Sequence, residues 1–385
     1  MADDIIAAKE DGVACREAVR KAALALGFDD CRIASVGGPA GHAALFGEWL
    51  AEGAHGTMEW MERGPERRMD PREVLPGCRS VVVLALNYLP PEGEVAWEGG
   101  VRGRMARYAH GDDYHGVIEG RLRDLDAVMQ EYGGRQRYYV DTGPVLERDW
   151  ATAAGMGWNG KSTVQIHRRL GAWFFLAELL TTLEMPADEV ERDRCGTCVR
   201  CVESCPTRAI TAERRLDARR CLSYLTIEHK GAIPEEFRRA LGDRIYGCDE
   251  CLEVCPWNRF AVASREQAFA ARPFVAHWAL RDFLGLDDEG FRELFRWSPV
   301  KRIGRSAFLR NVCVALGNVG EREDLGVLEK AAGGGDELIA EHARWAIGEI
   351  EARVAGPGGA TRDWGCREGG ESGAAARAGK GYDRV

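Results

Sequence analysis

Seven of the thirteen cysteines lie in two short runs whose spacing is that of iron–sulfur ligands. The first run, CGTCVRCVESCP, has the C-x2-C-x2-C-x3-C-P pattern of bacterial ferredoxins, and the second, CDECLEVCP, repeats the end of that pattern. The residues are Cys195, Cys198, Cys201 and Cys205 in the first run and Cys248, Cys251 and Cys255 in the second. In such runs three closely spaced thiolates bind one cluster, while the fourth reaches a second cluster.

The second run lacks its own first cysteine, and Cys221 is the substitute by elimination. The crossing rule then predicts two [4Fe–4S] clusters. Their ligands would be Cys195, Cys198, Cys201 and Cys255 for the first, and Cys205, Cys221, Cys248 and Cys251 for the second. Pairs of C-x2-C also build structural zinc sites, but such sites do not require a C-P ending, which occurs twice here. We therefore interpret the runs as an electron-transfer relay.

Composition is typical of a globular intracellular protein. The chain has 385 residues, of which 45% are hydrophobic, enough for two or three domains with cores of their own. No apolar run approaches the roughly 18 residues of a membrane span, and the acidic start MADDIIAAKEDG is unlike a secretory signal. The remaining cysteines are scattered and the total is odd, which favours free thiols in a reducing compartment. We expect a cytoplasmic protein.

Four residues of the first half are candidates for catalysis or ligand binding. Asp141 ends a predicted strand just before a predicted helix, where a carboxylate is either a helix cap or an acid–base group. Trp158, Asn159 and Lys161 belong to WNGKS, a loop whose glycine allows close approach of a large ligand, or which is an ordinary turn. No G-x-G-x-x-G follows a strand, so the pattern does not indicate a dinucleotide fold.

Hydrophobic periodicity divides the chain into four parts. Residues 1–185 alternate helical and strand patterns, which predicts an α+β or α/β domain, with 162–182 as a β-hairpin around RRLG. Residues 186–262 form the cysteine-rich, ferredoxin-like module, and residues 263–354 are helical and resemble a short HEAT-type repeat or, alternatively, an ordinary helical cap. Residues 355–385 are rich in Gly, Ala and charge, which predicts a disordered tail.

The net charge of −9 argues against general nucleic-acid binding. Two local clusters of basic residues nevertheless occur, and each is either an RNA-binding surface or a solvated face. They consist of Arg214, Arg215, Arg219 and Arg220 after the first cysteine run, and of Lys301, Arg302, Arg305 and Arg310 near residue 300.

Several further segments carry a specific resemblance. ALNYLP, RYAHGDDYH, YYVDTGPVLERDWA, GMGWNGKST and GAWFFLAELLTT precede the cysteine runs, while CLSYLTIEHKGAIPEEFR and DRIYGCDECLEVCPWNRF follow the first run. From about residue 10 to residue 350 the chain closely resembles the epoxyqueuosine reductases, cobalamin-dependent enzymes that complete queuosine in transfer RNA. The ferredoxin run alone is common, whereas these flanking segments are specific.

The resemblance implies a base-off cobalamin in residues 1–185 that is reduced through the two clusters. A low-potential donor such as ferredoxin or flavodoxin would supply the electrons, and the substrate would be the anticodon stem-loop of tRNA with epoxyqueuosine at the wobble position. Asp141 matches the family's proton donor in its D-[ST]-[AG]-P-[IV]-L-E-R segment, and Trp158, Asn159 and Lys161 match its cobalamin-contacting region. The D-x-H-x-x-G signature of a histidine-ligated cobalamin is only half present, and we expect no dedicated histidine ligand. We also expect a monomer.

Three other interpretations remain open at this point. A reductive dehalogenase also combines cobalamin with two such clusters, but those enzymes usually carry a twin-arginine leader that this N-terminus does not show. An electron-transfer subunit would bind no corrinoid and have no activity alone. A zinc-ribbon RNA-binding protein would be colourless and contain zinc.

Overall fold

The computed structural model describes residues 2–37, 43–90 and 100–355. A four-stranded sheet in the order β1-β2-β7-β4 forms the centre of the N-terminal part. Its strands are β1 (Asp30–Ser35), β2 (Ser80–Asn87), β7 (Phe174–Thr181) and β4 (Gln136–Tyr139). Every neighbouring pair is antiparallel, so this part is α+β rather than α/β.

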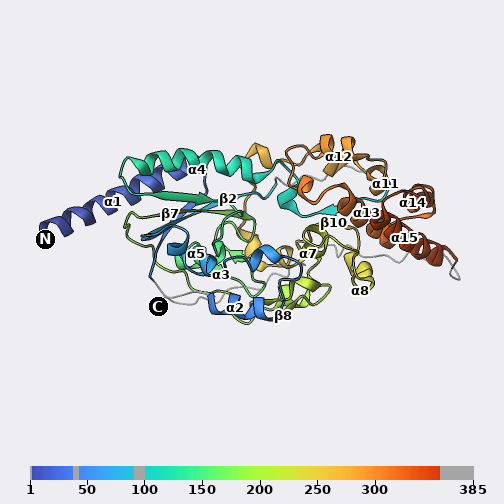
Figure 1. The fold of residues 1–385 in the computed structure, drawn as a ribbon, viewed down its shortest axis with the longest axis horizontal. Helices are drawn as coiled ribbons and strands as arrows, with labels where there is room; N and C mark the ends of the chain where they lie inside the picture. The colour runs from blue at the N-terminus through green and yellow to red at the C-terminus, as the bar shows by residue number, and fades with distance from the viewer. Residues whose placement is uncertain (1, 38–42, 91–99, 356–385) are drawn as a thin grey trace, which may run out of the picture.

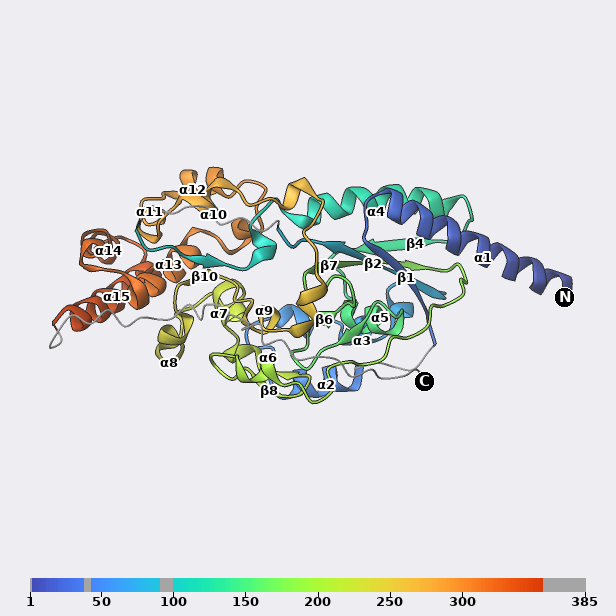
Figure 2. The same cartoon turned by 180° about the vertical axis from the view of Figure 1, so that it is seen from behind.

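Helices cover both faces of this sheet (Figures 1 and 2). Helices α1 (Ala2–Ala25) and α4 (Tyr114–Gln130) lie on one face, and α3 (Pro65–Met69) and α5 (Glu147–Ala153) lie on the other, with α2 (Ala43–Ala51) beyond them. All eight residues of β2 are buried, because its side chains alternate between two apolar layers. The nearly continuous apolar run of β2 follows from this burial on both faces.

The predicted hairpin over residues 162–182 is wrong. Strand β6 (Gln165–Ile166) pairs with β5 (Trp158–Asn159), and β7 pairs with β2 and β4 instead. Only an isolated bridge between His167 and Gly171 joins the two segments. The apolar β7 is buried along almost its whole length, which a two-stranded hairpin cannot provide and the middle of a sheet can.

The cysteine-rich segment forms short elements around the two runs. These are α6 (Arg200–Glu203), β8 (Ile210–Ala212), β9 (Arg215–Leu216), α7 (Leu222–Ile227), α8 (Glu235–Arg238), β10 (Arg244–Tyr246) and α9 (Glu250–Glu253). Helices α6 and α9 pack against each other, which brings the two runs together. Strand β10 pairs in parallel with β3 (Arg104–Met105), so a segment from the first half of the chain crosses to this region.

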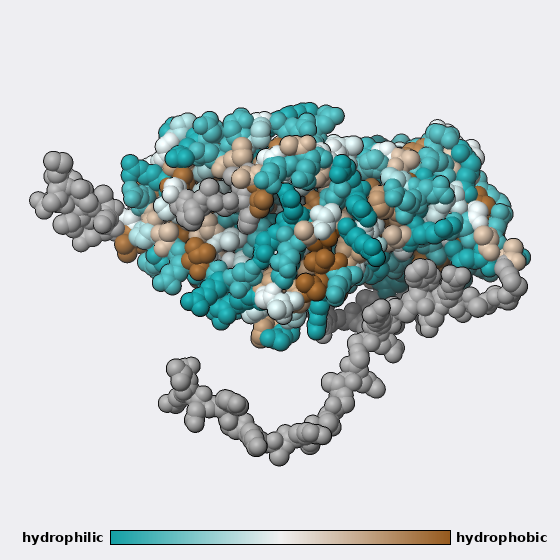
Figure 3. All heavy atoms as spheres, turned by 90° about the horizontal axis from the view of Figure 1, so that it is seen from below, coloured by the Kyte–Doolittle hydropathy of each residue, from teal (hydrophilic) through white to brown (hydrophobic). Residues whose placement is uncertain are grey.

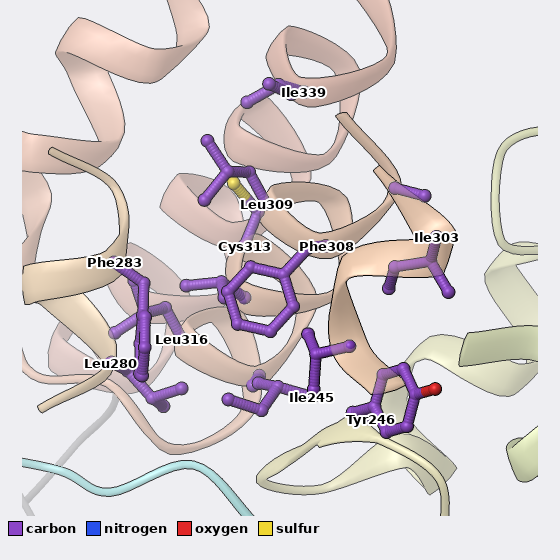
Figure 4. Close-up of a cluster of buried hydrophobic side chains, with 14 of the residues drawn as sticks. Ile245, Tyr246, Leu280, Phe283, Ile303, Phe308, Leu309, Cys313, Leu316 and Ile339 are labelled. Atoms are coloured by element: carbon purple, nitrogen blue, oxygen red, sulfur yellow. The ribbon is translucent and has the colours of Figure 1, made fainter. Parts of the chain in front are cut away.

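The C-terminal part is helical and has its own core. It contains α10 (Pro273–His277), α11 (Leu280–Phe283), α12 (Asp288–Leu294), α13 (Arg305–Val319), α14 (Leu325–Ala332) and α15 (Glu337–Ala355). Phe283, Phe308 and Leu316 meet Ile245 of β10 in a shared apolar cluster, as Figure 4 shows. The helical core therefore continues into the cysteine-rich segment. The predicted tail beyond residue 355 lies outside the described residues.

Short 3-10 turns connect these elements. They lie at Glu59–Met61, Pro71–Glu73, Arg107–Ala109, Ala218–Arg220, Arg239–Leu241, Pro256–Phe260, Gln267–Phe269, Pro299–Ile303 and Arg322–Asp324. Seen from below, the surface is mostly hydrophilic, with small separate groups of hydrophobic side chains (Figure 3). Among the described residues, no helix combines the length and the apolar character that crossing a bilayer requires.

Candidate redox site and cavity

The structure brings cysteines of both runs and Cys221 near one another, and their assignment as ligands of two clusters stays a prediction. Burial, followed by repulsion from Cys195, Cys201 and Cys198, raises the pKa of Cys255, so these four thiols lie near one another. Burial, followed by repulsion from Cys221 and Cys248 and, more weakly, Cys205, raises the pKa of Cys251. Each set thus combines both runs, with Cys221 in the second set. Since ligands contributed by both runs must meet, the packing of α6 against α9 creates these sets.

Burial shapes the chemistry of these thiols. It raises the pKa of Cys248 to about 11, although Arg244 acts in the opposite direction. In the first set, burial followed by repulsion from Cys195 raises the pKa of Cys201. Buried thiols with raised pKa values become thiolates when cations compensate their charge, and soft thiolates are the ligands that iron–sulfur clusters use.

Trp158 and Ala209 point N–H groups at predicted ligand sulfurs. The indole Nε1 of Trp158 donates to Cys195 Sγ at 3.4 Å, and the backbone N–H of Ala209 donates to Cys205 Sγ at 3.2 Å. Trp158 is almost completely buried, at 2% exposure, so its one polar atom is committed to this contact. Hydrogen bonds to sulfur are one of the means by which proteins set cluster potentials.

A cavity of about 710 Å³ lies beside the second cysteine set. Its volume is within the usual range for small-molecule and cofactor sites. Cys205, Cys221, Cys248 and Cys251 all line it, whereas the four cysteines of the first set do not. Its lining also includes apolar side chains from α2 and the turn after it, namely Leu45, Phe46, Trp49, Met58 and Trp60. The second set is therefore the one that faces the cavity.

Asp141 lies on the wall of this cavity in a left-handed backbone conformation, with a φ of 57°. The Tyr114 hydroxyl donates to Asp141 Oδ2 at 2.5 Å, and His115 Nε2 lies 3.9 Å from the same oxygen. The backbone N–H of Asp141 donates to Glu147 Oε1 at 2.7 Å. Asp141 is therefore not a helix cap for α5; its carboxyl group is half-exposed towards the cavity and oriented by α4.

The half-present D-x-H motif has a local structural role. Asp113 is the N-cap of α4, and its Oδ1 lies 2.7 Å from His115 Nδ1. Burial lowers the pKa of His115, but the Asp113 bond and the charge of Asp141 outweigh it and leave this pKa raised. The sequence did not place Tyr114 or His115 next to Asp141. Tyr114 and His115 end the segment RYAHGDDYH, and Asp141 lies in YYVDTGPVLERDWA, so the signal was that both segments carry the family resemblance.

The three predicted cobalamin contacts lie in different environments. Asn159 lines the cavity, and its Oδ1 is buried without a hydrogen-bond partner in the described part of the chain. Such an orphaned acceptor fits a ligand that brings a donor. Trp158 and Lys161 are not among the residues that line the cavity, since Trp158 faces Cys195 and Lys161 Nζ pairs with Glu213 at 2.7 Å. Contact of these three residues with cobalamin stays a prediction.

The basic clusters are less available than their sequence indicates. Arg310 is completely buried and donates to the backbone oxygens of Leu225, His229 and Gly231, so it cannot reach RNA. Arg302 pairs with Glu228 at 2.6 Å. In the first cluster, Arg215 pairs with Glu48.

Two protein-family models match parts of the chain. "4Fe-4S double cluster binding domain" matches residues 194–258, and "Epoxyqueuosine reductase QueG, DUF1730" matches residues 68–142. The epoxyqueuosine reductase of Xanthomonas campestris pv. campestris is 41% identical over 350 residues, which cover 89% of this chain and 98% of the relative. That of Escherichia coli K12 is 41% identical over 312 residues, covering 80% and 82%.

Solved structures agree with these relatives. A crystal structure of epoxyqueuosine reductase with an epoxyqueuosine-modified tRNA-Tyr stem loop is similar to this chain, with a TM-score of 0.81 and 29% identity. The match covers 87% of this chain and 89% of that chain. The epoxyqueuosine reductase structure from Streptococcus thermophilus has a TM-score of 0.80 and 27% identity, with coverages of 87% and 90%.

Proposed function

Because this chain belongs to the epoxyqueuosine reductase family, we propose that it reduces epoxyqueuosine at the wobble position of tRNA to queuosine. The observation that carries this proposal is Asp141, which faces a large cavity lined on another side by the thiols of the second cysteine set. A carboxyl group and an electron relay thus meet at one space, which is the combination that reductive opening of an epoxide requires.

Removing the epoxide oxygen as water takes two electrons and two protons. In this proposal a ferredoxin or flavodoxin supplies the electrons, and clusters held by the two cysteine sets would provide the route to the cavity, which the second set lines. Cobalamin, held there by Asn159 and the apolar wall, would supply a strongly reducing cobalt centre. The cysteines would hold the clusters in the ligand sets given above, and Trp158 and Lys161 would be further cobalamin contacts.

The residues of the chain itself handle the proton. Asp141 gives one of the two protons to the epoxide oxygen as its C–O bond breaks, and solvent supplies the second, while Tyr114 and His115 orient the carboxyl group. The wobble base lies in a single-stranded loop, so little unstacking energy opposes its entry into the cavity.

The proposal extends to the domains and partners. Residues 1–185 would be the cobalamin-binding catalytic domain, 186–262 the ferredoxin-like domain and 263–354 a HEAT-like domain that contacts the anticodon stem-loop. We further propose that the protein acts in the cytoplasm as a monomer.

Anaerobic metal analysis and turnover together test this function. We expect about eight iron atoms and no zinc per chain, a spectral change on adding cobalamin, and conversion of a modified stem-loop. Asp141→Asn should keep iron and cobalamin while turnover falls about 10²–10⁴-fold. Asp124→Asn, on the exposed side of α4, is the matched control. Full turnover in Asp141→Asn would refute the acid role, and zinc in place of iron would refute the relay.

A further inference from the structure

Behind Asp141 lies a second carboxyl group that no role described above requires. Glu178 occupies the middle of β7, opposite Val83 of β2 and Tyr139 of β4, and is completely buried. Phe174 and Leu180 of the same strand face the apolar layer next to α5. Glu178 is an even number of residues from both, so its side chain lies on the same face of the sheet. Its side chain therefore points towards α5, where Glu147 begins the helix.

The Glu178 carboxyl group has no ordinary partner. Neither oxygen has a hydrogen-bond donor among the residues that the structure describes. The groups that act on it are the carboxyls of Glu147 and, more weakly, Asp141. An isolated carboxylate without a donor is strongly disfavoured at this depth, and two adjacent carboxylates cannot both be charged there. One proton held between Glu147 and Glu178 resolves both problems, because it supplies the missing hydrogen bond.

Glu147 connects this buried pair to the catalytic loop. Its Oε1 accepts the backbone N–H of Asp141 at 2.7 Å, and Glu147 itself lines the cavity. Asp141 has a φ of 57°, which costs energy for a residue with a side chain and needs support from its surroundings. The hydrogen bond to Glu147 is such a support, since it fixes the N–H direction that the left-handed conformation requires.

We propose that Glu147 and Glu178 form an acid pair that shares one proton and thereby holds the Asp141 loop in position. Glu147 and Glu178 are positioning residues, because neither is shown to touch a substrate. When the pair loses its proton, the two carboxylates repel each other, Glu147 moves away, and Asp141 loses its anchor. The inference rests on the proposed role of Asp141 as the proton donor.

The surroundings determine the pH range of this switch. Burial, followed by the charge of Asp141, raises the pKa of Glu147 to about 7, and burial with the charge of Glu147 raises that of Glu178. Other titratable or charged groups reach the pair from the neighbouring elements. They are Arg68 of α3, Tyr114 of α4, Asp141 after β4 and Arg148 of α5. Arg148 donates to the Thr163 backbone oxygen and Arg68 to that of Gly143, so neither cation is bonded to the pair.

The test compares pH profiles of the holoenzyme with Glu178→Gln. The amide has the same shape, cannot ionise, and donates an N–H to Glu147 at every pH. With saturating stem-loop and excess reductant, we expect wild-type kcat to fall about tenfold for each pH unit above 7, as the protonated pair disappears. In Glu178→Gln this fall should be absent, with kcat constant within about twofold from pH 6 to 8.5. Glu131→Gln, an exposed carboxyl on the surface after α4, should keep the wild-type profile.

A second readout is independent of activity. Amide hydrogen exchange of the peptide 140–147, corrected for the intrinsic pH dependence, should lose protection above pH 7 in the wild type and keep it in Glu178→Gln. Glu147→Asp, whose carboxyl is one methylene shorter, should lose this protection at every pH. The Glu147→Asp variant still tests the inference if Glu178→Gln does not fold. Identical pH profiles and identical exchange in the wild type and the variants would overturn the inference.

The two proposals fail separately. If Asp141→Asn abolishes turnover but Glu178→Gln behaves as wild type in both readouts, the pair has no positioning role and the proton donor stands. If Asp141→Asn is fully active, the donor role fails. Exchange that changes with pH in the wild type alone would still show that the pair anchors the loop.

Discussion

Replacing Trp158 by Phe removes one N–H from the surroundings of the first cluster and leaves a ring in its place. The indole Nε1 donates to Cys195 Sγ at 3.4 Å, and the side chain is only 2% exposed, so water cannot readily replace the lost donor. A donor to sulfur stabilises the more negative, reduced cluster. The variant should therefore have a lower reduction potential.

The size of this shift follows from the strength of one hydrogen bond. A net contribution of about 0.5–1.5 kcal/mol, with 59 mV per factor of ten for one electron, corresponds to about 20–65 mV. Only the first cluster should shift, because Trp158 contacts a thiol of that set. The second cluster provides an internal reference in the same sample.

The assay is an anaerobic redox titration followed by electron paramagnetic resonance. Trp257→Phe is the matched control, since the Trp257 ring meets Trp158 edge-on at 4.9 Å but its indole makes no hydrogen bond seen in the described structure. The control should leave both potentials unchanged. A Trp158→Phe protein with full iron content and unshifted potentials, or with a raised potential, would refute the reasoning.

Three further outcomes are expected. Arg310→Met should lower the unfolding free energy by more than about 3 kcal/mol in anaerobic denaturant titrations, because several buried carbonyls lose their donor. A smaller loss would mean that water replaces the guanidinium. The Glu147–Glu178 pair binds its proton more tightly in the folded chain, so its stabilising contribution is complete below the ordinary pKa of 4.5 and is lost as pH rises through about 7. Glu178→Gln should therefore gain Tm relative to the wild type between pH 5 and pH 7.5, and a pH-independent difference would contradict this. Trp297, 73% exposed with a left-handed φ of 61°, donates no side-chain bond seen in the described structure, and its backbone oxygen accepts the Asp113 N–H beside the catalytic residues. Trp297→Ala should weaken stem-loop binding by about 1–3 kcal/mol and leave the dependence of the binding constant on salt concentration unchanged. Lys301→Glu should make the slope of that salt dependence shallower by about one. Equal salt slopes in both variants would exclude an RNA contact at this segment.

The structure also changes which residues are suitable for testing RNA contacts. Charge reversal at Arg302 would break its ion pair with Glu228, and Arg305 donates to the Leu286 backbone oxygen. Effects of such variants would mix folding with binding. Trp297 and Lys301 are exposed on the same segment and separate the two effects.

The sequence by itself determined the ligand pattern and the family. Spacings such as C-x2-C-x2-C act over one or two turns of chain, so they constrain local geometry directly and can be interpreted without the rest of the fold. Cysteines of the two runs lie near one another in the structure, and Cys221, which was assigned by elimination, lies near Cys251. The helix over 114–130 and the buried strand over 80–87 also follow from local periodicity.

Only the tertiary structure decided which residues surround these motifs. Trp158 turned out to face Cys195, β7 to pair with β2 and β4 rather than β6, and Arg310 to be buried. Glu178, to which the sequence assigned no role, lies against Glu147, behind Asp141. Each of these facts depends on contacts between segments distant in the chain. Local spacing carries no information about them, because burial and pairing are settled by the whole fold.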